Sequence, residues 1–499
     1  MSNLGFSQAI ETLEAFRGTL THGSETGRSQ RFNDDLIGND ALVDGPFGPH
    51  RLVYADYVAS GRALGAVERF IMEKVLPFYA NSHTEASYCG AFMTGMRHAA
   101  RRLIAEQCGA TGEHAVIFAG SGATAGLNRL VHLFEISTSP TRARVIIGPY
   151  EHHSNILPWR ESGAEVVQIG EATSGGPDLA QLDVALSGSA DRPTYCSFSA
   201  ASNVTGILSD VTEVSSRAKA AGARIIWDYA GAGPYVPIDM EPAKGIKIDA
   251  VALSPHKFIG GPAASGVLIV RRDAVSASKP SWPGGGTVKF VSRRAHDYAD
   301  RIESREEGGT PNVIGDIRAA LAFLVKEAIG TATFSNRNAQ LATRMLEAWR
   351  NDDRIEILGN TEAARLPIIS FRLRDGRGGY VHHQLVTTML SDRFGIQARG
   401  GCACAGPYAH DLLAIDDNES EDIRVAIAGG NEAMKPGFVR LNISVLLPDS
   451  KVDYIFDAVR RLATDALDFV DRYSLDPNRA IFTPRAVHTV TDKKILPAG

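Results

Sequence analysis

A lysine, a histidine and a serine lie within four residues at the end of a predicted buried strand. The tetrapeptide Ser254-Pro255-His256-Lys257 follows the apolar run 249–253. A lysine at a sheet edge loses hydration, so its pKa falls and its amine becomes nucleophilic. Lys257 can then form a Schiff base with pyridoxal 5'-phosphate (PLP), while Ser254 and His256 bind the phosphate. A surface loop is the alternative, because short motifs often match by chance.

A carboxylate ends another predicted strand. Asp228 follows the apolar residues 225–227, and the segment between it and Lys257 is long enough for a helix and a strand. PLP withdraws electrons well only while its pyridine nitrogen is protonated, and a buried carboxylate keeps it so. In a parallel sheet both residues would lie at neighbouring strand ends, where such folds bind ligands. The alternative is an aspartate that caps the following turn.

Three further loops follow predicted strands and carry residues suited to this cofactor. The turn 119–126 is rich in small residues and leads into a helix, whose free N–H groups favour a phosphate. The pair His152-His153 offers a ring that can stack on the pyridine and move protons. Asn203 lies in a short turn after the strand 194–198. Ordinary turns and a surface histidine pair are the alternatives.

Together these residues resemble the class V aminotransferase family, and within it the closest likeness is to the group II cysteine desulfurases and selenocysteine lyases. The resemblance runs from about Tyr54 to Asp453. It depends on the order of the motifs Gly122-Ala-Thr-Ala-Gly-Leu-Asn128, Glu151-His-His-Ser-Asn155, Ser202-Asn-Val-Thr-Gly206, Asp228, Ser254-Pro-His-Lys257 and Gly309-Thr-Pro-Asn312. It implies a PLP enzyme of fold type I, an α/β fold. A large domain would hold a mostly parallel seven-stranded sheet flanked by helices, and a smaller α+β domain would follow.

The resemblance also implies a role for each matching position in binding the cofactor. Lys257 would hold PLP, His152 would stack on its ring, and Asp228 would bind the ring nitrogen. The phosphate would be bound by Ala123, Thr124, Ser254 and His256 and, from the other subunit of a homodimer, by Thr310. One departure affects this site: the family's usual glutamine, which bonds the ring hydroxyl, is replaced by Gly231.

A second group of positions matches residues that bind the substrate, which the resemblance implies is a small amino acid. Arg440 would clamp the substrate carboxylate, for which a planar bidentate donor is well suited. Ala59 and Arg399 would lie near that carboxylate, and Asn203 would lie near it or near the ring hydroxyl. For Arg440 alone, an arginine on an edge strand is the alternative.

Two cysteines decide between reaction types. Cys402 and Cys404 lie among glycines and alanines beside Arg399, where a thiolate is favoured. Cys404 keeps the family's spacing from Arg399, whereas Cys402 is extra and resembles the Cys-x-Cys of the desulfurase-like domain in molybdenum cofactor sulfurases. Cys404 is therefore the predicted catalytic nucleophile, which would form a persulfide. The alternatives are incidental thiols, a disulfide that switches the site off, or a metal pair, for which two ligands are too few.

The predicted function is that of a PLP-dependent cysteine desulfurase, which converts L-cysteine to L-alanine and leaves a persulfide on the enzyme for a sulfur-acceptor protein. Two alternatives use the same scaffold: an aminotransferase or epimerase, and a β-eliminating C–S lyase that needs no protein thiol. A non-enzymatic PLP-binding protein is a third, but intact Lys257 and Asp228 argue against it.

Composition agrees with a large enzyme. A chain of 499 residues exceeds one hydrophobic core and suggests two lobes. The net charge of −5 gives no basic footprint for nucleic acid. No apolar run is long enough to span a membrane. The first residues lack a basic segment followed by an apolar one, so no signal peptide is expected and the expected compartment is the cytoplasm.

Four regions are predicted along the chain. Residues 1–50 form a polar, turn-rich extension that is expected to wrap the partner subunit. Residues 51–315 form the large PLP-binding domain, with 51–80 partly packing on the small domain, and its last strand, 264–270, runs antiparallel. Residues 316–472 form the small domain, which begins with a long helix. The tail, 473–499, is expected to be irregular.

Overall fold

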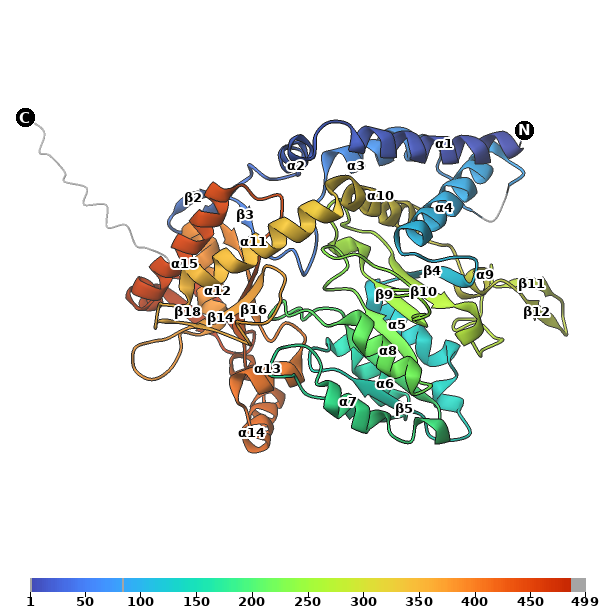
Figure 1. Ribbon diagram of the computed structural model, residues 1–499. Helices are drawn as coiled ribbons and strands as arrows, with labels where there is room; N and C mark the ends of the chain where they lie inside the picture. Colours follow the sequence, from blue (N-terminus) through green and yellow to red (C-terminus); the bar gives the residue numbers. More distant parts are fainter. Residues whose placement is uncertain (1, 83–84, 486–499) are drawn as a thin grey trace, which may run out of the picture.

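A seven-stranded sheet forms the centre of the larger domain in the computed structural model, which describes residues 2–82 and 85–485 (Figure 1). The strand order is β4-β10-β9-β8-β7-β5-β6. The bounds are β4 (His114–Gly120), β5 (Arg144–Ile147), β6 (Glu165–Gln168), β7 (Thr194–Ser199), β8 (Arg224–Asp228), β9 (Ala250–Leu253) and β10 (Gly266–Arg271). β10 pairs antiparallel with β4 and β9, and the other pairs are parallel. The predicted fold, with its seven strands and antiparallel last strand, is confirmed.

Alternate side chains of the strands enter two separate cores, because successive residues of a strand point to opposite faces. In β9, Val251 and Leu253 join the core beneath one layer of helices, whereas Ala250 and Ala252 join the other. The first layer contains α4 (Tyr88–Gln107), α7 (Leu179–Leu186), α8 (Val211–Ala220) and α10 (Val313–Ile329). The second contains α5 (Gly122–Leu133) and α6 (Leu157–Glu161). Helices therefore cover both faces of the sheet.

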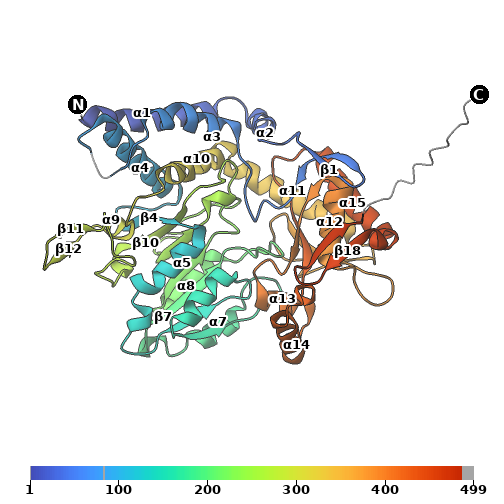
Figure 2. The same ribbon diagram turned by 180° about the vertical axis from the view of Figure 1, so that it is seen from behind.

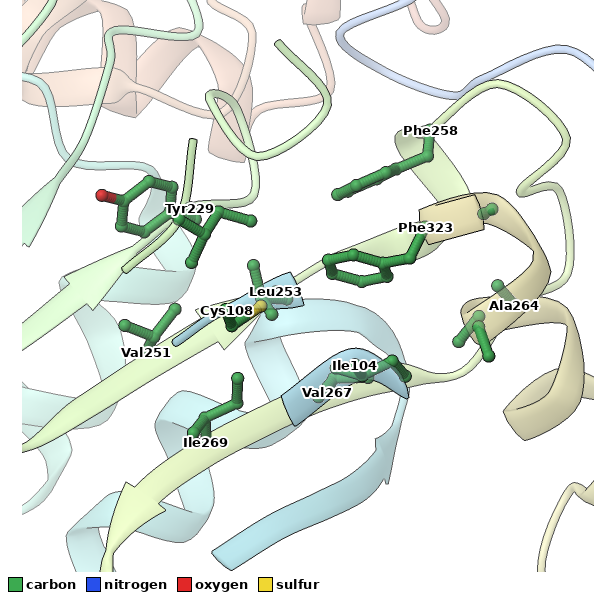
Figure 3. Close-up of a cluster of buried hydrophobic side chains, with 14 of the residues drawn as sticks. Ile104, Cys108, Tyr229, Val251, Leu253, Phe258, Ala264, Val267, Ile269 and Phe323 are labelled. Atoms are coloured by element: carbon green, nitrogen blue, oxygen red, sulfur yellow. The ribbon is translucent and has the colours of Figure 1, made fainter. Parts of the chain in front are cut away.

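The turn that follows β9 is anchored by an aromatic contact beneath the sheet edge. Phe258, which follows Lys257, packs on Phe323 of α10 with ring centroids 4.9 Å apart. Figure 3 shows both rings beside Leu253 at the end of β9. Phe258 is fully buried, so the position of the preceding lysine is fixed by the packing of the core.

The smaller domain is built on a four-stranded antiparallel sheet with the order β13-β14-β17-β16. Its strands are β13 (Ile355–Ile357), β14 (Ile368–Leu373), β16 (Arg399–Gly401) and β17 (Phe438–Asn442). The helices α11 (Thr331–Trp349), α12 (His383–Phe394) and α15 (Asp449–Phe469) supply its core. Val53 in β3 (Val53–Tyr54) also joins this core, and β3 pairs in parallel with β15 (Ile396–Gln397). An early segment of the chain therefore packs on the small domain.

The boundary predicted at residue 316 falls inside α10. The buried side chains of this helix belong to the larger core, and the small-domain core first takes residues from α11, at Leu341. Gly330 separates the two helices. We propose that the small domain begins near Gly330, since a helix packs as one unit with the core that buries it.

The N-terminal region is more regular than its composition predicts. The prediction of a turn-rich segment over 1–50 is wrong for its first part, which forms α1 (Ser2–Thr21) and α2 (Glu25–Asp34). A hairpin of β1 (Leu42–Gly45) and β2 (Gly48–Arg51) follows. α1 lies along α4 and α10 of its own chain in both views (Figures 1 and 2). Its buried face repeats at helical spacing, with Ala9, Leu13, Phe16 and Leu20. Polar residues on the opposite face mask this pattern in the composition.

The remaining elements lie at the edges of the two domains. α3 (Gly65–Phe70) precedes α4, α9 (Ile302–Glu306) packs on β4, and the small domain carries α13 (Gly406–Leu413) and α14 (Asp417–Ala428). The hairpin of β11 (Val288–Val291) and β12 (His296–Tyr298) projects from the large domain (Figure 1). The prediction that the tail is irregular is wrong for its first residues, because β18 (Tyr473–Asp476) and β19 (Ile481–Pro484) form a hairpin. Residues 486–499 lie outside the described part. No helix among the described residues has the length and apolar character needed to cross a membrane.

Candidate active site

A cavity of about 270 Å³ lies where the ends of β7, β8 and β9 meet the small domain. Twelve of the thirteen predicted site residues line it: Ala59, Ala123, Thr124, His152, Asn203, Asp228, Ser254, His256, Lys257, Arg399, Cys404 and Arg440. The thirteenth, Thr310, is exposed and does not line this cavity. Its predicted contact with a second subunit stays a prediction.

Lys257 and Asp228 lie at neighbouring strand ends of this cavity. Lys257 ends a short turn (Pro255–Lys257) after β9, and Asp228 is the last residue of β8. Burial lowers the pKa of Lys257 to about 8, although the charge of Asp228 opposes the shift. Burial raises the pKa of Asp228, against the N–H of Ala230, which donates to Oδ1 at 2.7 Å. Lys257 is therefore partly neutral near neutral pH, as a nucleophilic amine must be.

The start of α5 forms a tight cradle against the turn that carries Lys257. Gly122 has φ +62°, and a Cβ there would lie 2.8 Å from Cε1 of His256 and 2.9 Å from Oγ of Ser254. The N–H of Ala123 donates to Oγ of Ser254 at 2.9 Å. The positive φ and these contacts favour glycine here, and residues 122–124 of the first helical turn line the cavity.

A hydrogen bond from Ser154 fixes the tautomer of the neutral His152 ring. The N–H of Ser154 donates to Nδ1 of His152 at 3.1 Å, so in the neutral ring the proton is on Nε2. Burial, helped by the charge of Lys257, lowers the pKa of His152 to about 4. Ser154 also bonds Thr124 through its Oγ at 2.7 Å. The sequence reasoning missed Ser154, because histidine is not one of the usual N-cap residues and so gives no cap signal.

A buried carboxylate lies behind the cavity wall. Glu151 accepts hydrogen bonds from the N–H of Ser199 at 2.9 Å and from its hydroxyl at 2.8 Å. Ser199 faces Asp228 in the β7–β8 ladder. Burial raises the pKa of Glu151 to about 7, and the nearby charge of Asp228 adds to the shift. Sequence reasoning did not single out Glu151, because its partner lies on another strand.

Two arginines from adjacent strands share one aspartate. Arg399 of β16 faces Arg440 of β17 across the ladder. Arg440 donates through Nη2 to Oδ1 of Asp56 at 2.6 Å, and Arg399 donates through Nε to Oδ2 at 2.9 Å. Nε of Arg440 is buried and has no hydrogen-bond partner among the described residues. This cluster therefore has two cations and one anion, and Nε of Arg440 remains an unsatisfied donor among the described residues.

The loop that carries the cysteines is tethered to the cavity wall. Cys404 is exposed and Cys402 is half-buried. Ala403 and Cys404 have φ of 51° and 56°, which is the left-handed region. Nδ2 of Asn203 donates to the carbonyl of Ala403 at 2.8 Å. Oδ1 of Asn203 is buried without a partner among the described residues, so one end of this amide remains available.

Gly231, which replaces the family's glutamine, has room for a side chain. A Cβ at Gly231 would have Ala201 O at 3.4 Å and Cβ of Asn203 at 3.7 Å as its nearest neighbours. These are ordinary van der Waals distances, so the backbone does not demand glycine here. Gly61 is the opposite case, because a Cβ there would lie 1.8 Å from the carbonyl of Phe258. The N–H of Gly61 also donates to the carbonyl of His256 at 3.0 Å.

The exposed loop of Thr310 is bracketed by a buried ion-pair network. Glu307 and Asp316 flank this loop, and Arg97 of α4 bonds both, through Nη2 at 2.7 Å and Nε at 2.8 Å. Arg101 adds a second cation to Glu307. All four side chains are largely buried. The network fixes the two ends of the loop to α4.

A family model described as aminotransferase class-V matches residues 53–434, a span that includes every residue lining the cavity except Arg440. The chain belongs to this family. A cysteine desulfurase of Pectobacterium atrosepticum is 31% identical over 362 residues, which cover 71% of this chain and 84% of the relative. A probable cysteine desulfurase of Streptomyces coelicolor is 28% identical over 367 residues, covering 72% and 84%. The protein is an enzyme, and the predicted family resemblance is confirmed.

Solved structures share the fold. A cysteine desulfurase from Thermococcus onnurineus superposes with a TM-score of 0.71 at 22% identity, over 87% of this chain and 97% of the other. The cysteine desulfurase CsdA from Escherichia coli gives a TM-score of 0.69 at 23% identity, over 88% and 98%. At this identity the likeness establishes the fold alone, which is PLP fold type I.

Proposed function

We propose that this enzyme is a PLP-dependent cysteine desulfurase that converts L-cysteine to L-alanine and keeps the sulfur as a persulfide on Cys404. The observation that carries the proposal is the meeting of Cys404, Lys257 and Arg440 in one cavity. A nucleophilic thiol, a buried amine and a carboxylate clamp are the three groups that this reaction needs from the protein. The curated relatives named as cysteine desulfurases support it.

The cavity suits the cofactor on its own geometry. Because Gly122 has no side chain, Ser254 and His256 can pack against the start of α5, and these residues line the cavity together with Ala123 and Thr124 as a polar wall for a phosphate. A buried acceptor, Oδ1 of Asn203, and a buried donor, Nε of Arg440, are left without partners among the described residues. Buried polar atoms normally find a partner, so a polar ligand between them would satisfy both.

We infer how the residues would hold this group. Lys257 would bind it covalently, Asp228 would pair with its ring nitrogen, and the ring of His152 would stack on it. Ala123, Thr124, Ser254 and His256 would contact the phosphate. Bound PLP supplies an electron sink that stabilises negative charge on the substrate's α carbon. The absence of a glutamine at position 231 leaves Asn203 as the nearby side chain for the ring hydroxyl.

The protein's own groups would perform two tasks before sulfur transfer. Arg440 would bind the substrate carboxylate, and Arg399 would add positive charge beside it. Lys257 would move the proton at the α carbon through Nζ. Its lowered pKa matches this task, because a general base works best with a pKa near the working pH. His152 is neutral at that pH and carries a proton on Nε2.

Sulfur transfer is the step assigned to Cys404. Its thiolate attacks the substrate sulfur, so an S–S bond forms while the C–S bond breaks. The electron pair of the C–S bond stays with the β carbon, which takes a proton to give alanine. The persulfide remains on Cys404, which is exposed and so accessible to a sulfur-acceptor protein.

A single assay tests this function against its rivals. The protein loaded with PLP is incubated with L-cysteine, and alanine, sulfide and pyruvate are measured, with the Lys257→Ala variant as the control. Equal amounts of alanine and protein-bound or released sulfur support the desulfurase. Pyruvate and ammonia as main products would mean a β-eliminating lyase. Transfer of the amino group to a keto acid would mean an aminotransferase.

We further propose a homodimer in which Thr310 reaches the phosphate of the second subunit. The position of Thr310 supports this, because it is exposed, lies outside its own chain's cavity and has both ends of its loop fixed by Arg97. Sedimentation at assay concentration tests it, since a fully active monomer would contradict the shared site.

A further inference from the structure

The loop that carries Cys404 is held at two points by one residue, His153, that the proposed chemistry does not use. The backbone N–H of His153 donates to the carbonyl of Cys404 at 2.8 Å. On the other side of the loop, Nε2 of His153 accepts the N–H of Gly406 at 2.9 Å. One histidine thus bonds the backbone immediately at the cysteine and again two residues later, where α13 begins.

The chemistry of this contact fixes the protonation state of the ring. A nitrogen that accepts an N–H cannot carry a proton itself, so the neutral ring of His153 has its proton on Nδ1. Burial lowers the pKa of His153, with the charge of Arg160 as a smaller contribution. The accepting state is therefore the stable one near neutral pH. The first N–H groups of a helix have no partner within it, and His153 satisfies one of them in α13.

The contact also joins two parts of the site. His153 follows His152 directly, and His152 lines the cavity beside Lys257. A displacement of the loop would move Cys404 relative to the wall formed by this histidine pair. Ala403 and Cys404 both have left-handed backbones, which residues with a side chain adopt only when contacts hold them there. The bonds from His153 and Asn203 are such contacts.

We propose that His153 is a positioning residue that holds the Cys404 loop against the cofactor side of the cavity. It acts through the backbone of residues 404 and 406 and touches no reacting atom. The inference is based on the proposed role of Cys404 as the nucleophile. The competing explanation is that His153 only caps α13, in which case its loss would affect folding but not the position of the thiol.

Two variants of His153 separate these explanations. His153→Ala removes the acceptor for Gly406, whereas His153→Gln replaces it with a side-chain carbonyl of similar reach. His410→Ala is the matched control, because His410 bonds the same short helix, through Nδ1 to the carbonyl of Gly406, and bonds Ser420 through Nε2 instead of the backbone of Cys404. Each holoenzyme is compared by cofactor absorption, by kcat and KM for cysteine, and by the alkylation rate of Cys404, measured on its peptide by mass spectrometry.

The expected result is a split between binding and sulfur transfer. His153→Ala should lower kcat about tenfold with little change in KM or absorption, since misplacing a reacting group slows only the step that uses it. Its Cys404 alkylation rate should change several-fold, and His153→Gln should restore most of both properties. His410→Ala should leave both near the parent values.

Two results would overturn the inference. One is a folded His153→Ala holoenzyme with unchanged kcat and alkylation rate. The other is a failure of His153→Gln to restore either property. The alkylation rate reports on the loop without any sulfur transfer. If Cys404→Ser retains full turnover, the proposed nucleophile fails, but the alkylation comparison still decides the role of His153.

Discussion

Arg440, which lines the cavity, forms a buried ion pair with Asp56, with Nη2 2.6 Å from Oδ1. Both side chains are almost fully enclosed. Arg399 donates to the second oxygen of the same aspartate, so two positive charges face one negative charge. The excess positive charge suits a substrate with a single carboxylate, and Asp56 holds the guanidinium of Arg440 in a fixed orientation for it.

This pair leads to a prediction about substrate binding. Arg440→Lys keeps the charge but loses the planar pair of donors, so KM for cysteine should rise about tenfold or more, with a smaller change in kcat. Steady-state kinetics on the loaded enzyme measure this. Arg372→Lys, which alters an arginine paired with Glu356 outside the cavity, is the control. An unchanged KM in Arg440→Lys would remove Arg440 from the carboxylate site.

The two cysteines should differ sharply in importance. Cys404→Ser should lower persulfide formation about a thousandfold or more, because an essential covalent nucleophile is lost. Cofactor absorption should be retained, since Lys257 and Asp228 are untouched. Cys402→Ser is the matched variant on the same loop and should have a mild effect. Labelling of the bound sulfane sulfur with an alkylating reagent measures both, and equal losses would assign Cys402 a role of its own.

Lys257 should give cofactor binding a characteristic pH dependence. Its pKa is lowered to about 8, so the neutral, nucleophilic amine predominates above that pH and is lost below it. The rate at which the cofactor-free protein combines with PLP should therefore rise through an inflection near pH 8. Because the charge of Asp228 raises this pKa, Asp228→Asn should move the inflection to lower pH. Stopped-flow absorbance measures the rate, and borohydride reduction followed by peptide mapping verifies the attachment site.

The network around Arg97 should contribute strongly to stability. Arg97→Met leaves Asp316 buried without its arginine, and breaking such a pair costs about 3–5 kcal/mol of unfolding free energy. Arg102→Met on the same helix is the control, because Arg102 is mostly exposed and its partner Glu14 lies 3.9 Å away. Urea unfolding should separate the two variants clearly. Similar midpoints for both would show that the buried network adds little.

The sequence predicts the cofactor side of the site well, and the reason is local. Lys257, Asp228 and Gly122 each lie directly at the end of an apolar strand, so the strand pattern alone puts them at one edge of the sheet. Six of the seven strands were predictable for the same reason, since their buried residues form short continuous runs, whereas β6 at the sheet edge is only partly buried.

The residues that were missed depend on contacts between distant segments. Nothing near Asp56 indicates that it binds Arg399 and Arg440, which follow it by most of the chain. His153 was read with His152 as one pair, although only His152 faces the cavity. Asn203 was expected at the ring hydroxyl or substrate carboxylate, which stays a prediction, but the bond from its amide nitrogen to the carbonyl of Ala403 was not foreseen. Side-chain partners of this kind are determined by tertiary packing, which the local pattern of the sequence does not indicate.

The close approach at Gly61 limits how this enzyme could be recombined with its relatives. The segment of Gly61 lies so near the carbonyl of Phe258 that a side chain at position 61 would collide with it, and the N–H of Gly61 bonds the carbonyl of His256. A chimera with a crossover between them would combine the segment around Gly61 from one parent with the turn that carries Lys257 from another. Library designs should therefore inherit residues 56–61 and 254–261 from the same parent, even though the two blocks are far apart in the gene.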